Sequence, residues 1–245
     1  MIKKCFWLGL FCFLLTPSIA FASNAYIDQY PFEFKKGNFY VSLNAGATFL
    51  NDIDFGSDLN YAGVTSNISG TGTFDTGWSL EGTFGYKFNE FIRGEFNLGY
   101  TEMDHDKVEA TGTITSGGTN LTVSGSADVK GQVDAVYGLT NVIFTPLGNT
   151  SFGGGKLTPL VGGGIGFVYW EDSIDTISTS TTVLQVGGKE TATDFASNVI
   201  AGLEYSQNKN LLIGVRYRHA WIDSGKNGFD NSQADQVSGT LTYRF

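Results

Sequence analysis

Apolar and polar residues alternate along eight separate stretches of this chain, each long enough to form one β-strand. In the first stretch, Phe39, Val41 and Leu43 fall on one face, whereas Tyr40 and Ser42 fall on the other. A period of two residues is typical of a strand, because successive side chains point to opposite sides. Strands are therefore predicted at residues 38–50, 77–88, 91–103, 132–146, 157–171, 193–205 and 211–222, and in the terminal run from Val237 to Phe245.

The alternation is clear in most stretches but ambiguous in residues 132–146, where either face could point outward. A β-bulge near Gly138 would shift the phase there. In residues 157–171, apolar side chains alternate with Gly162, Gly164 and Gly166, which are predicted to face inward. We expect these glycines to leave room for long arginine side chains from the opposite strands.

The connections between the stretches alternate in length. The links after the second and sixth stretches are short, "NE" and "SQNKN", and the link "LGNTSFGGGK" after the fourth is moderate. Long links rich in Gly, Ser, Thr, Asn and Asp occupy residues 51–76, 104–130, 172–191 and 223–235. Short turns at one end and long loops at the other are typical of outer-membrane barrels. Further alternation inside the second and third long links, such as Ile114, Leu121 and Val123, predicts hairpins that rise above the membrane.

The composition also favours a membrane barrel over a soluble domain. Charged residues make up 16% of the chain, compared with about 25% in typical soluble proteins. The chain is rich in glycine and aromatic residues, yet no segment beyond the N-terminal region is apolar enough to span a bilayer as a helix. Strands can cross a bilayer only when all their backbone groups are paired, as in a closed barrel. The predicted fold is all-β: an eight-stranded antiparallel up-and-down transmembrane β-barrel with short periplasmic turns and four long extracellular loops.

The N-terminal residues have the organisation of a secretory signal peptide. Lys3 and Lys4 precede an apolar run, and "AFA" at residues 20–22 matches the A-x-A cleavage pattern. Cys5 and Cys12, the only cysteines, lie in this segment, so no disulfide or cysteine metal site is expected in the mature chain. We predict a signal peptide at 1–22, a periplasmic lead-in at 23–37 and the transmembrane barrel at 38–245.

The charge of the mature chain excludes one class of partner. Two of the 15 basic residues and none of the 24 acidic residues lie in the signal segment, which leaves 13 basic residues and a net charge of −11. Nucleic-acid binding favours a basic surface, so no nucleic-acid partner is predicted.

Four stretches make the sequence similar to a known group. They are "FYVSLNAGATF", "FGYKFNEFIRGEFNLGY", "KLTPLVGGGIGFVYWE", and "ASNVIAGLEYSQNKNLLIGVRYRHAWI" together with the terminal "LTYRF". The sequence resembles the small eight-stranded outer-membrane barrels: the OmpA-like transmembrane domain and, more closely, the opacity and surface-antigen proteins of Gram-negative bacteria. The resemblance implies that the protein lies in the cell outer membrane.

The resemblance also implies a role for the terminal strand. Leu241, Tyr243 and Phe245 would form the signal that the barrel-assembly machinery recognises. Tyr243 and Phe245 should face outward near the periplasmic edge. The tryptophans of the mature chain are predicted near the opposite edge: Trp78, Trp170 and Trp221. Because the sequence ends with the eighth strand, a peptidoglycan-binding domain and a cell-wall tether are not implied.

Charged residues at inward positions are the main candidate site. The interior of an eight-stranded barrel is just wide enough for side chains, and an isolated charge there is costly, so these residues should pair. A lumen charge cluster is predicted at mid-depth, with Glu81 or Glu95 within salt-bridge reach of Arg216 or Arg218. Four further charges are predicted near the periplasmic mouth: Lys87, Arg93, Glu204 and Arg244. A salt-bridged plug and a gated ion path would use the same residues, and the plug is favoured.

Enzymatic patterns are weak. Barrel-borne lipid A deacylases use adjacent His and Ser residues on a late strand, but here His219 is followed by Ala220. Ser224 lies too far along the chain to replace that serine, and His219 is predicted to point outward near the external rim. No HExxH, P-loop or nucleophile-elbow pattern occurs. We therefore predict that the protein is not an enzyme.

Metal and cofactor patterns are equally weak. His105 stands between Asp104 and Asp106, which suggests either a metal site or, as we favour, a histidine on a solvated surface. The acidic residues of the first long link do not have the spacing of an EF-hand. No metal site and no cofactor are predicted.

The predicted function is that of a monomeric outer-membrane surface protein. Its barrel would be a scaffold in contact with outer-membrane lipid and lipopolysaccharide. Its extracellular loops would act as an adhesin or surface antigen and meet a host-surface ligand. The alternative is a small gated ion channel or porin through the barrel lumen.

Overall fold

A computed structural model describes residues 38–245 except 62–63, 117–118, 148–149, 153–154, 180–182, 207, 209 and 224–231. The chain divides into two units, Met1–Lys35 and Lys36–Phe245, and only the second contains described residues. The predicted signal peptide at 1–22 and the lead-in at 23–37 lie outside these residues. In the described part of the chain, no helix has the length and apolar character needed to cross a membrane.

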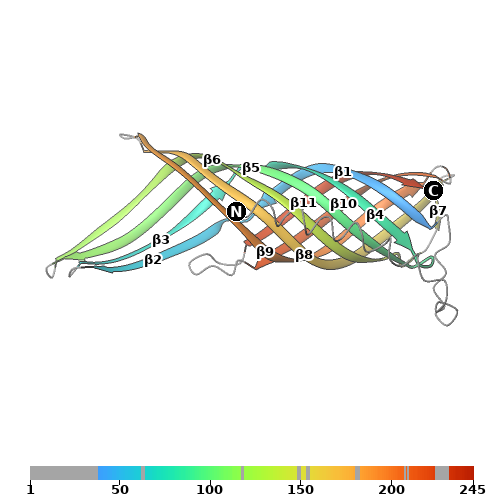
Figure 1. Cartoon of the computed structure of the whole chain (residues 1–245), viewed down its shortest axis with the longest axis horizontal. Helices are drawn as coiled ribbons and strands as arrows, with labels where there is room; N and C mark the ends of the chain where they lie inside the picture. The colour runs from blue at the N-terminus through green and yellow to red at the C-terminus, as the bar shows by residue number, and fades with distance from the viewer. Residues whose placement is uncertain are drawn as a thin grey trace, which may run out of the picture. The chain divides into compact units, whose positions relative to one another are not determined.

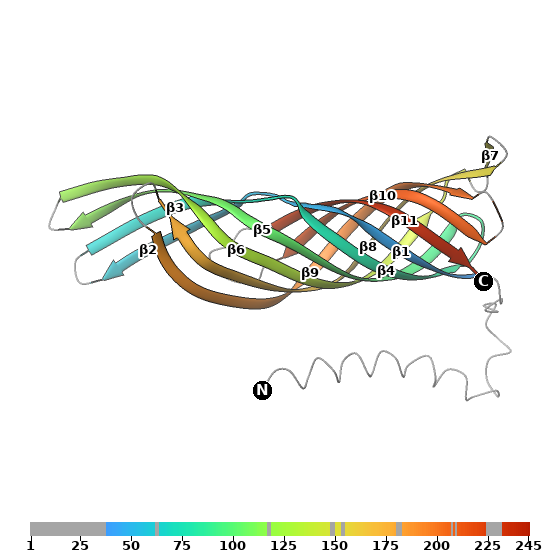
Figure 2. The same cartoon turned by 90° about the horizontal axis from the view of Figure 1, so that it is seen from above.

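Eight antiparallel strands of the second unit close into a barrel (Figures 1 and 2). In ring order they pair β1-β4-β5-β6-β8-β9-β10-β11, and β11 pairs with β1 from Tyr40↔Arg244 to Leu50↔Ala234. The predicted all-β, eight-stranded fold is therefore confirmed. The barrel strands are β1 (Phe39–Leu50), β4 (Gly77–Lys87), β5 (Ile92–Ser116), β6 (Thr119–Phe144), β8 (Gly155–Ser178), β9 (Val183–Ser206), β10 (Leu211–Asp223) and β11 (Ser232–Arg244).

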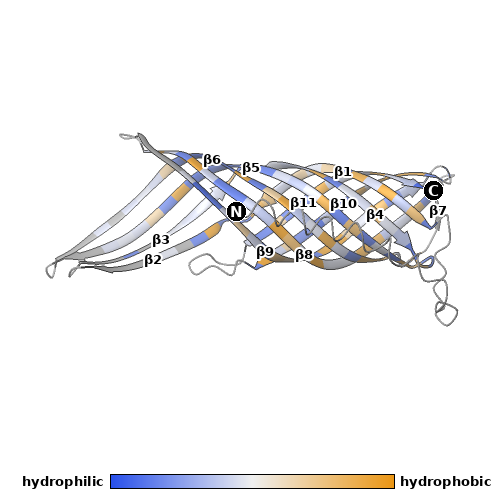
Figure 3. Ribbon diagram, viewed as in Figure 1, coloured by the Kyte–Doolittle hydropathy of each residue, from blue (hydrophilic) through white to orange (hydrophobic). Residues whose placement is uncertain are grey.

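The outer surface of the barrel is apolar, and much of the inner surface is polar. On β1, Leu43 is 54% exposed, whereas the neighbouring Ser42 and Asn44 are buried inside. Apolar positions alternate with polar ones along the barrel strands in the same way (Figure 3). This arrangement is the reverse of a soluble protein, and it fits a barrel whose outer face contacts lipid.

The fourth predicted strand, β6, has one continuous phase through the barrel. Val142 is 62% exposed, whereas Asn141 and Ile143 are buried. The predicted bulge at Gly138 is wrong, because Gly138 pairs with Leu98 and Phe167 without a register shift. The irregularities lie further out, between Lys130 and Gly131 and between Asp104 and Lys107. The pattern of β6 was ambiguous because its inward face is itself partly apolar.

The inward glycines of β8 lie against the neighbouring strand β6. A Cβ added to Gly164 or Gly166 would collide with the carbonyl oxygens of Thr140 or Gly138 on β6, not with an arginine. One at Gly162 would likewise meet Val142 and Ile143. These glycines therefore allow β8 and β6 to approach closely, and the expectation that they make room for arginine side chains stays a prediction.

The long links contain more strand than the sequence indicated. The hairpins predicted in the second and third links are confirmed, since β5 pairs with β6 as far as Ser116↔Thr119 and β8 with β9 as far as Ser178↔Val183. The first link contains an unpredicted hairpin of β2 (Ile53–Tyr61) and β3 (Val64–Phe74), which pairs with β5. Its Gly, Ser and Asn residues have low strand propensity, which concealed it. A short β7 (Thr150–Phe152) pairs with β8.

Candidate functional site

Six buried charged residues meet inside the barrel, and we call them the lumen network. They come from inward positions of β4, β5, β9 and β10, and none is more than 7% exposed. Three are basic and three are acidic, so that their formal charges cancel. The members of the lumen network are Glu81, Arg93, Glu95, Glu204, Arg216 and Arg218.

The first part of the lumen network is a chain of alternating charges. Arg216 donates from Nη1 and Nη2 to the two oxygens of Glu95 at 2.7 and 3.0 Å. Its Nη2 also donates to Glu204 Oε1 at 2.9 Å, and Arg93 Nη1 donates to Glu204 Oε2 at 2.6 Å. The Tyr40 hydroxyl donates to Glu95 Oε1 at 2.6 Å. The predicted salt bridge between Glu95 and Arg216 is confirmed.

The second part is centred on Glu81. Arg218 Nη1 donates to Glu81 Oε2 and, at 2.8 Å, to Gln236 Oε1. The amides of Asn44 and Asn97 donate to Glu81 Oε1 at 2.7 and 2.9 Å. Each buried carboxylate of the lumen network thus accepts several hydrogen bonds, as a charge in a narrow interior requires.

The four residues predicted at the periplasmic mouth differ in burial. Arg93 and Glu204 are buried and belong to the lumen network, whereas Lys87 and Arg244 are only partly buried. The backbone of Arg93 pairs with Lys87 near the strand end, but its long side chain reaches Glu204. Arg93 therefore pairs with a residue that was predicted at the same end of the barrel, and Lys87 and Arg244 lie near Arg93. The location of all four residues at the periplasmic mouth stays a prediction.

Two tyrosines of the site were not predicted. Tyr40 pairs with Gly85 and Tyr137 pairs with Gly99, and a Cβ on either glycine would collide with the tyrosine ring. The rings therefore lie against the strands, where Tyr137 can contact Arg218 and Gln236 through its hydroxyl at 3.3 and 3.1 Å. In the sequence, the only sign of these two tyrosines was the presence of glycines at inward positions, which leave room for an aromatic ring.

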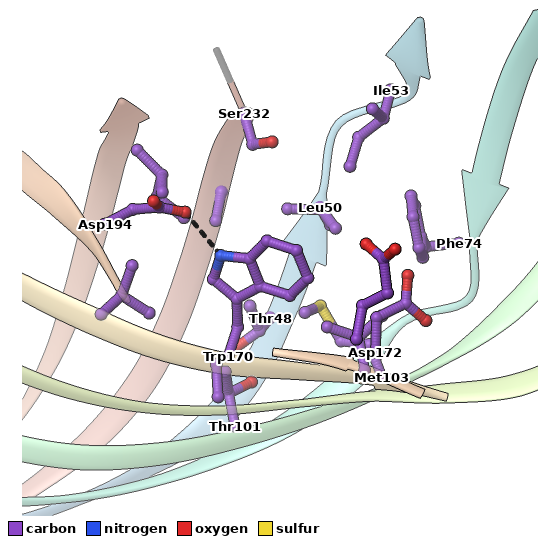
Figure 4. Close-up of a pocket in the computed structure, with 16 residues that line it drawn as sticks. Thr48, Leu50, Ile53, Phe74, Thr101, Met103, Trp170, Asp172, Asp194 and Ser232 are labelled. Carbon is purple, nitrogen blue, oxygen red and sulfur yellow. Dashed lines mark hydrogen bonds between the residues drawn. The ribbon is translucent and has the colours of Figure 1, made fainter. Parts of the chain in front are cut away.

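Beyond the lumen network, toward the long loops, lies a cavity of about 140 Å³, which we call the external lumen cavity. Trp170 lines it and donates its indole N–H to Asp194 Oδ2 at 2.6 Å (Figure 4). Trp170 thus lies at the predicted end of the barrel but points inward, unlike the exposed Trp78 and Trp221. Sequence reasoning missed this cavity, although Met103 and Val133 at inward positions were a signal for an apolar section of lumen.

The polar residues near the external rim form local pairs. His105 Nε2 lies 2.8 Å from Asp172 Oδ1, and the His105 side chain is only 8% exposed, so the solvated-surface interpretation is wrong. Above the barrel wall, Glu171 Oε1 accepts from Lys189 Nζ at 2.5 Å, and this hydrogen bond raises the pKa of Lys189. Within the described ranges, no group of three or more acidic, histidine or cysteine residues could hold a metal ion.

His219 lies on the outer side of the barrel near the external rim, as predicted. Its Nδ1 is 2.7 Å from Asp235 Oδ1, and its ring packs against that of Trp221 with the centroids 4.4 Å apart. Ser224 lies outside the described residues.

The residues of the predicted assembly signal face outward. Leu241, Tyr243 and Phe245 are all exposed, and the rings of the last two pack edge to face with centroids 5.4 Å apart. The predicted outward position of Tyr243 and Phe245 is confirmed, and their role in assembly stays a prediction.

A family model of the outer membrane protein beta-barrel domain matches residues 13–245. No curated protein matches the chain at a significant level. Among solved structures, the neisserial surface protein A is 15% identical over 85% of this chain and 97% of its own, with a TM-score of 0.45. OprG from Pseudomonas aeruginosa is 13% identical over 86% and 97%, with a TM-score of 0.47. Ail of Yersinia pestis, solved with the heparin analogue sucrose octasulfate, is 15% identical over 86% and 100%, with a TM-score of 0.39.

Proposed function

The chain belongs to the family of outer membrane protein β-barrel domains, and we propose that it is a surface interaction protein whose projecting strands bind a partner macromolecule outside the cell. Its location in the outer membrane follows from the family. The observation that carries the proposal is a sheet of β2, β3, β5 and β6 that continues past the end of the barrel wall (Figures 1 and 2).

The projecting sheet is built on β5 and β6. Strand β5 pairs with β4 only as far as Glu102, and beyond His105 it pairs with β3 instead, as far as Ser116. On the other side of this sheet, β6 pairs with β8 only from Asp128 onward along the chain. The sheet therefore has regular backbone pairing, in contrast to a loop without regular structure.

The projecting sheet offers an edge for recognition. Among the described strands, β2 pairs with β3 alone, so its other side presents backbone N–H and C=O groups without a strand partner. Such an edge can receive an extended segment of another protein as an additional strand. Asp54, Asp104, Asp106 and Glu109 lie on the sheet, and its described part holds two lysines, Lys107 on β5 and Lys130 on β6. This charge favours a protein partner over a polyanion.

The alternative function, an ion channel through the lumen, has weaker support. The lumen network occupies the inside of the barrel, and its carboxylates are at most 2% exposed. An ion could pass only after buried ion pairs had separated, and separation leaves charges without partners in a narrow interior. We therefore propose that the lumen network is a plug that stabilises the scaffold.

A catalytic function is not proposed. His219 pairs with Asp235 on the outer side, but the residue after it is Ala220, which has no nucleophilic group. A lipid hydrolase of the barrel type would need a serine there.

The test is adhesion of cells that display the protein on their surface. Replacing residues 53–74 by a two-residue Asn-Gly turn removes β2 and β3, and a matched variant shortens the β8–β9 hairpin between 174 and 188 instead. We expect the first variant to lose adhesion to epithelial monolayers and the second to retain it. Both barrels should still show the heat-dependent gel shift of a folded barrel. Retained adhesion without β2 and β3, or no adhesion by the wild-type protein, would contradict the proposal.

A further inference from the structure

The external lumen cavity has a closed floor. Thr48, which lines it, pairs with Gln236, and Gln236 contacts both Arg218 and the Ser79 hydroxyl, the latter at 2.7 Å. The lumen network therefore begins directly below the cavity. A molecule that enters from outside the cell cannot continue through the barrel, so the cavity has the geometry of a binding pocket.

The walls of the cavity are largely apolar. Aliphatic, thioether and aromatic side chains from eight different strands surround it, and the Trp170 indole forms one side (Figure 4). An engineered apolar cavity of ~150 Å³ binds benzene, so a cavity of this size can enclose one phenyl ring. The apolar wall is formed mainly by Leu50, Phe74, Met103, Val133, Trp170 and Ile222.

The charged groups of the cavity all have the same sign. Asp172, Glu190 and Asp194 line it, and none of its sixteen lining residues is basic. Asp194 is 8% exposed, and its Oδ2 accepts from the Trp170 indole. A carboxylate buried to this degree is stabilised by a cation, and the neutral indole N–H supplies none. Glu190 is exposed, so the acidic side of the cavity reaches solvent.

We propose that the external lumen cavity binds a small amphiphilic cation, namely an aromatic primary amine. The phenyl ring occupies the apolar part against Met103 and Trp170. The ammonium group donates to Asp194 and lies close to the electron-rich indole face, an arrangement that favours cations. This binding site is independent of the projecting sheet and would add a small-molecule function to the proposed surface protein.

The experiment uses the intact barrel in phosphatidylcholine nanodiscs, because detergent could itself occupy the cavity. Substituting Trp78→Phe and Trp221→Phe on the outer surface leaves Trp170 as the only tryptophan of the mature chain. Its emission is then titrated with three probes of similar shape: 2-phenylethylamine, 2-phenylethanol and 3-phenylpropionate. We expect the amine to bind about tenfold more tightly than the alcohol, because a charge-assisted hydrogen bond is added. The carboxylate should bind more weakly than either.

Three variants locate the binding. Ala135→Leu fills the cavity and should abolish the response, whereas Ala201→Leu, on the lipid-facing surface, should leave the affinity unchanged. Asp194→Asn should remove most of the preference for the amine over the alcohol. Equal affinities for amine and alcohol in the wild-type background would overturn the proposal. The proposal would also be overturned if Ala135→Leu left the emission change unchanged. That result would mean that the probes partition into the bilayer and do not enter the cavity. These two comparisons remain decisive even when Asp194→Asn does not fold.

Discussion

The guanidinium of Arg216 and the carboxylate of Glu95 form two parallel hydrogen bonds, 2.7 and 3.0 Å long, across the inside of the barrel. The residues lie 121 positions apart, on β10 and β5, which face each other from opposite sides of the ring. This pair therefore connects strands that share no backbone hydrogen bonds. It acts as a strut across the barrel, and Glu204 extends it toward Arg93.

Removing one carboxylate of this strut should destabilise the barrel. Glu95→Gln leaves Arg216 with an incomplete set of charge partners at a buried position, and breaking a buried pair costs about 3–5 kcal/mol. Unfolding by urea in liposomes, followed by tryptophan emission, measures this free energy. The matched control is Glu109→Gln on an exposed part of β5, for which we expect a change within about 0.5 kcal/mol. Equal effects of the two substitutions would show that the strut does not support the fold.

The lumen should conduct ions only after the plug is opened. We expect the wild-type barrel to give no steady openings in a planar bilayer. The double substitution Glu95→Ala with Arg216→Ala removes a neutral pair and shortens two inward side chains, so openings should appear. Single-channel recording makes the comparison, with the heat-dependent gel shift as the check of folding. Steady wild-type openings that change in the variant would favour the channel function instead.

The close approach of β6 and β8 predicts that alanine substitutions at two neighbouring glycines change the stability of the barrel by different amounts. Gly166→Ala places a methyl group against the Gly138 carbonyl oxygen, and overpacking of this kind costs about 1–3 kcal/mol. Gly138→Ala is the control, because its methyl group would lie 3.9 Å from Phe96 Cζ, an ordinary contact. Urea unfolding of both variants should show a clear loss of stability only for Gly166→Ala. A similar loss for both would mean that the loss reflects glycine removal in general.

The last aromatic residue should matter for assembly in cells. Phe245→Ser is expected to lower the amount of folded barrel in the outer membrane several-fold. Phe88→Ser is the control, because Phe88 is an exposed aromatic residue beside a short turn at the same end. The measurement is the folded fraction in membrane extracts, together with refolding of the purified chains in liposomes. If Phe245 is part of an assembly signal, Phe245→Ser lowers the folded fraction in membrane extracts but leaves refolding in liposomes unchanged. If only lipid contact is lost, Phe245→Ser and Phe88→Ser reduce both quantities to the same extent.

Sequence periodicity succeeded on strands whose two faces differ clearly in polarity. Tyr243 and Phe245 were correctly placed outward, because the outward residues of a strand within the bilayer must be apolar, aromatic or small. It was least clear on β6, where Val133 and Leu139 point inward and the apolar character therefore appears on both faces. Periodicity also missed β2, whose pairing with β3, and through it β5, is a tertiary property.

The sequence by itself determined the number of barrel strands, the orientation of their side chains and the presence of buried charges that must pair. These properties follow from the local rule that side chains alternate across a strand and from the different solvents on its two sides. Only the tertiary structure decided which charges meet, since Arg93 joins Glu204 and Arg216 joins Glu95 through the closure of the ring. The external lumen cavity, with Trp170 turned inward toward Asp194, likewise depends on the curvature of the closed barrel, which brings residues distant in sequence around one space.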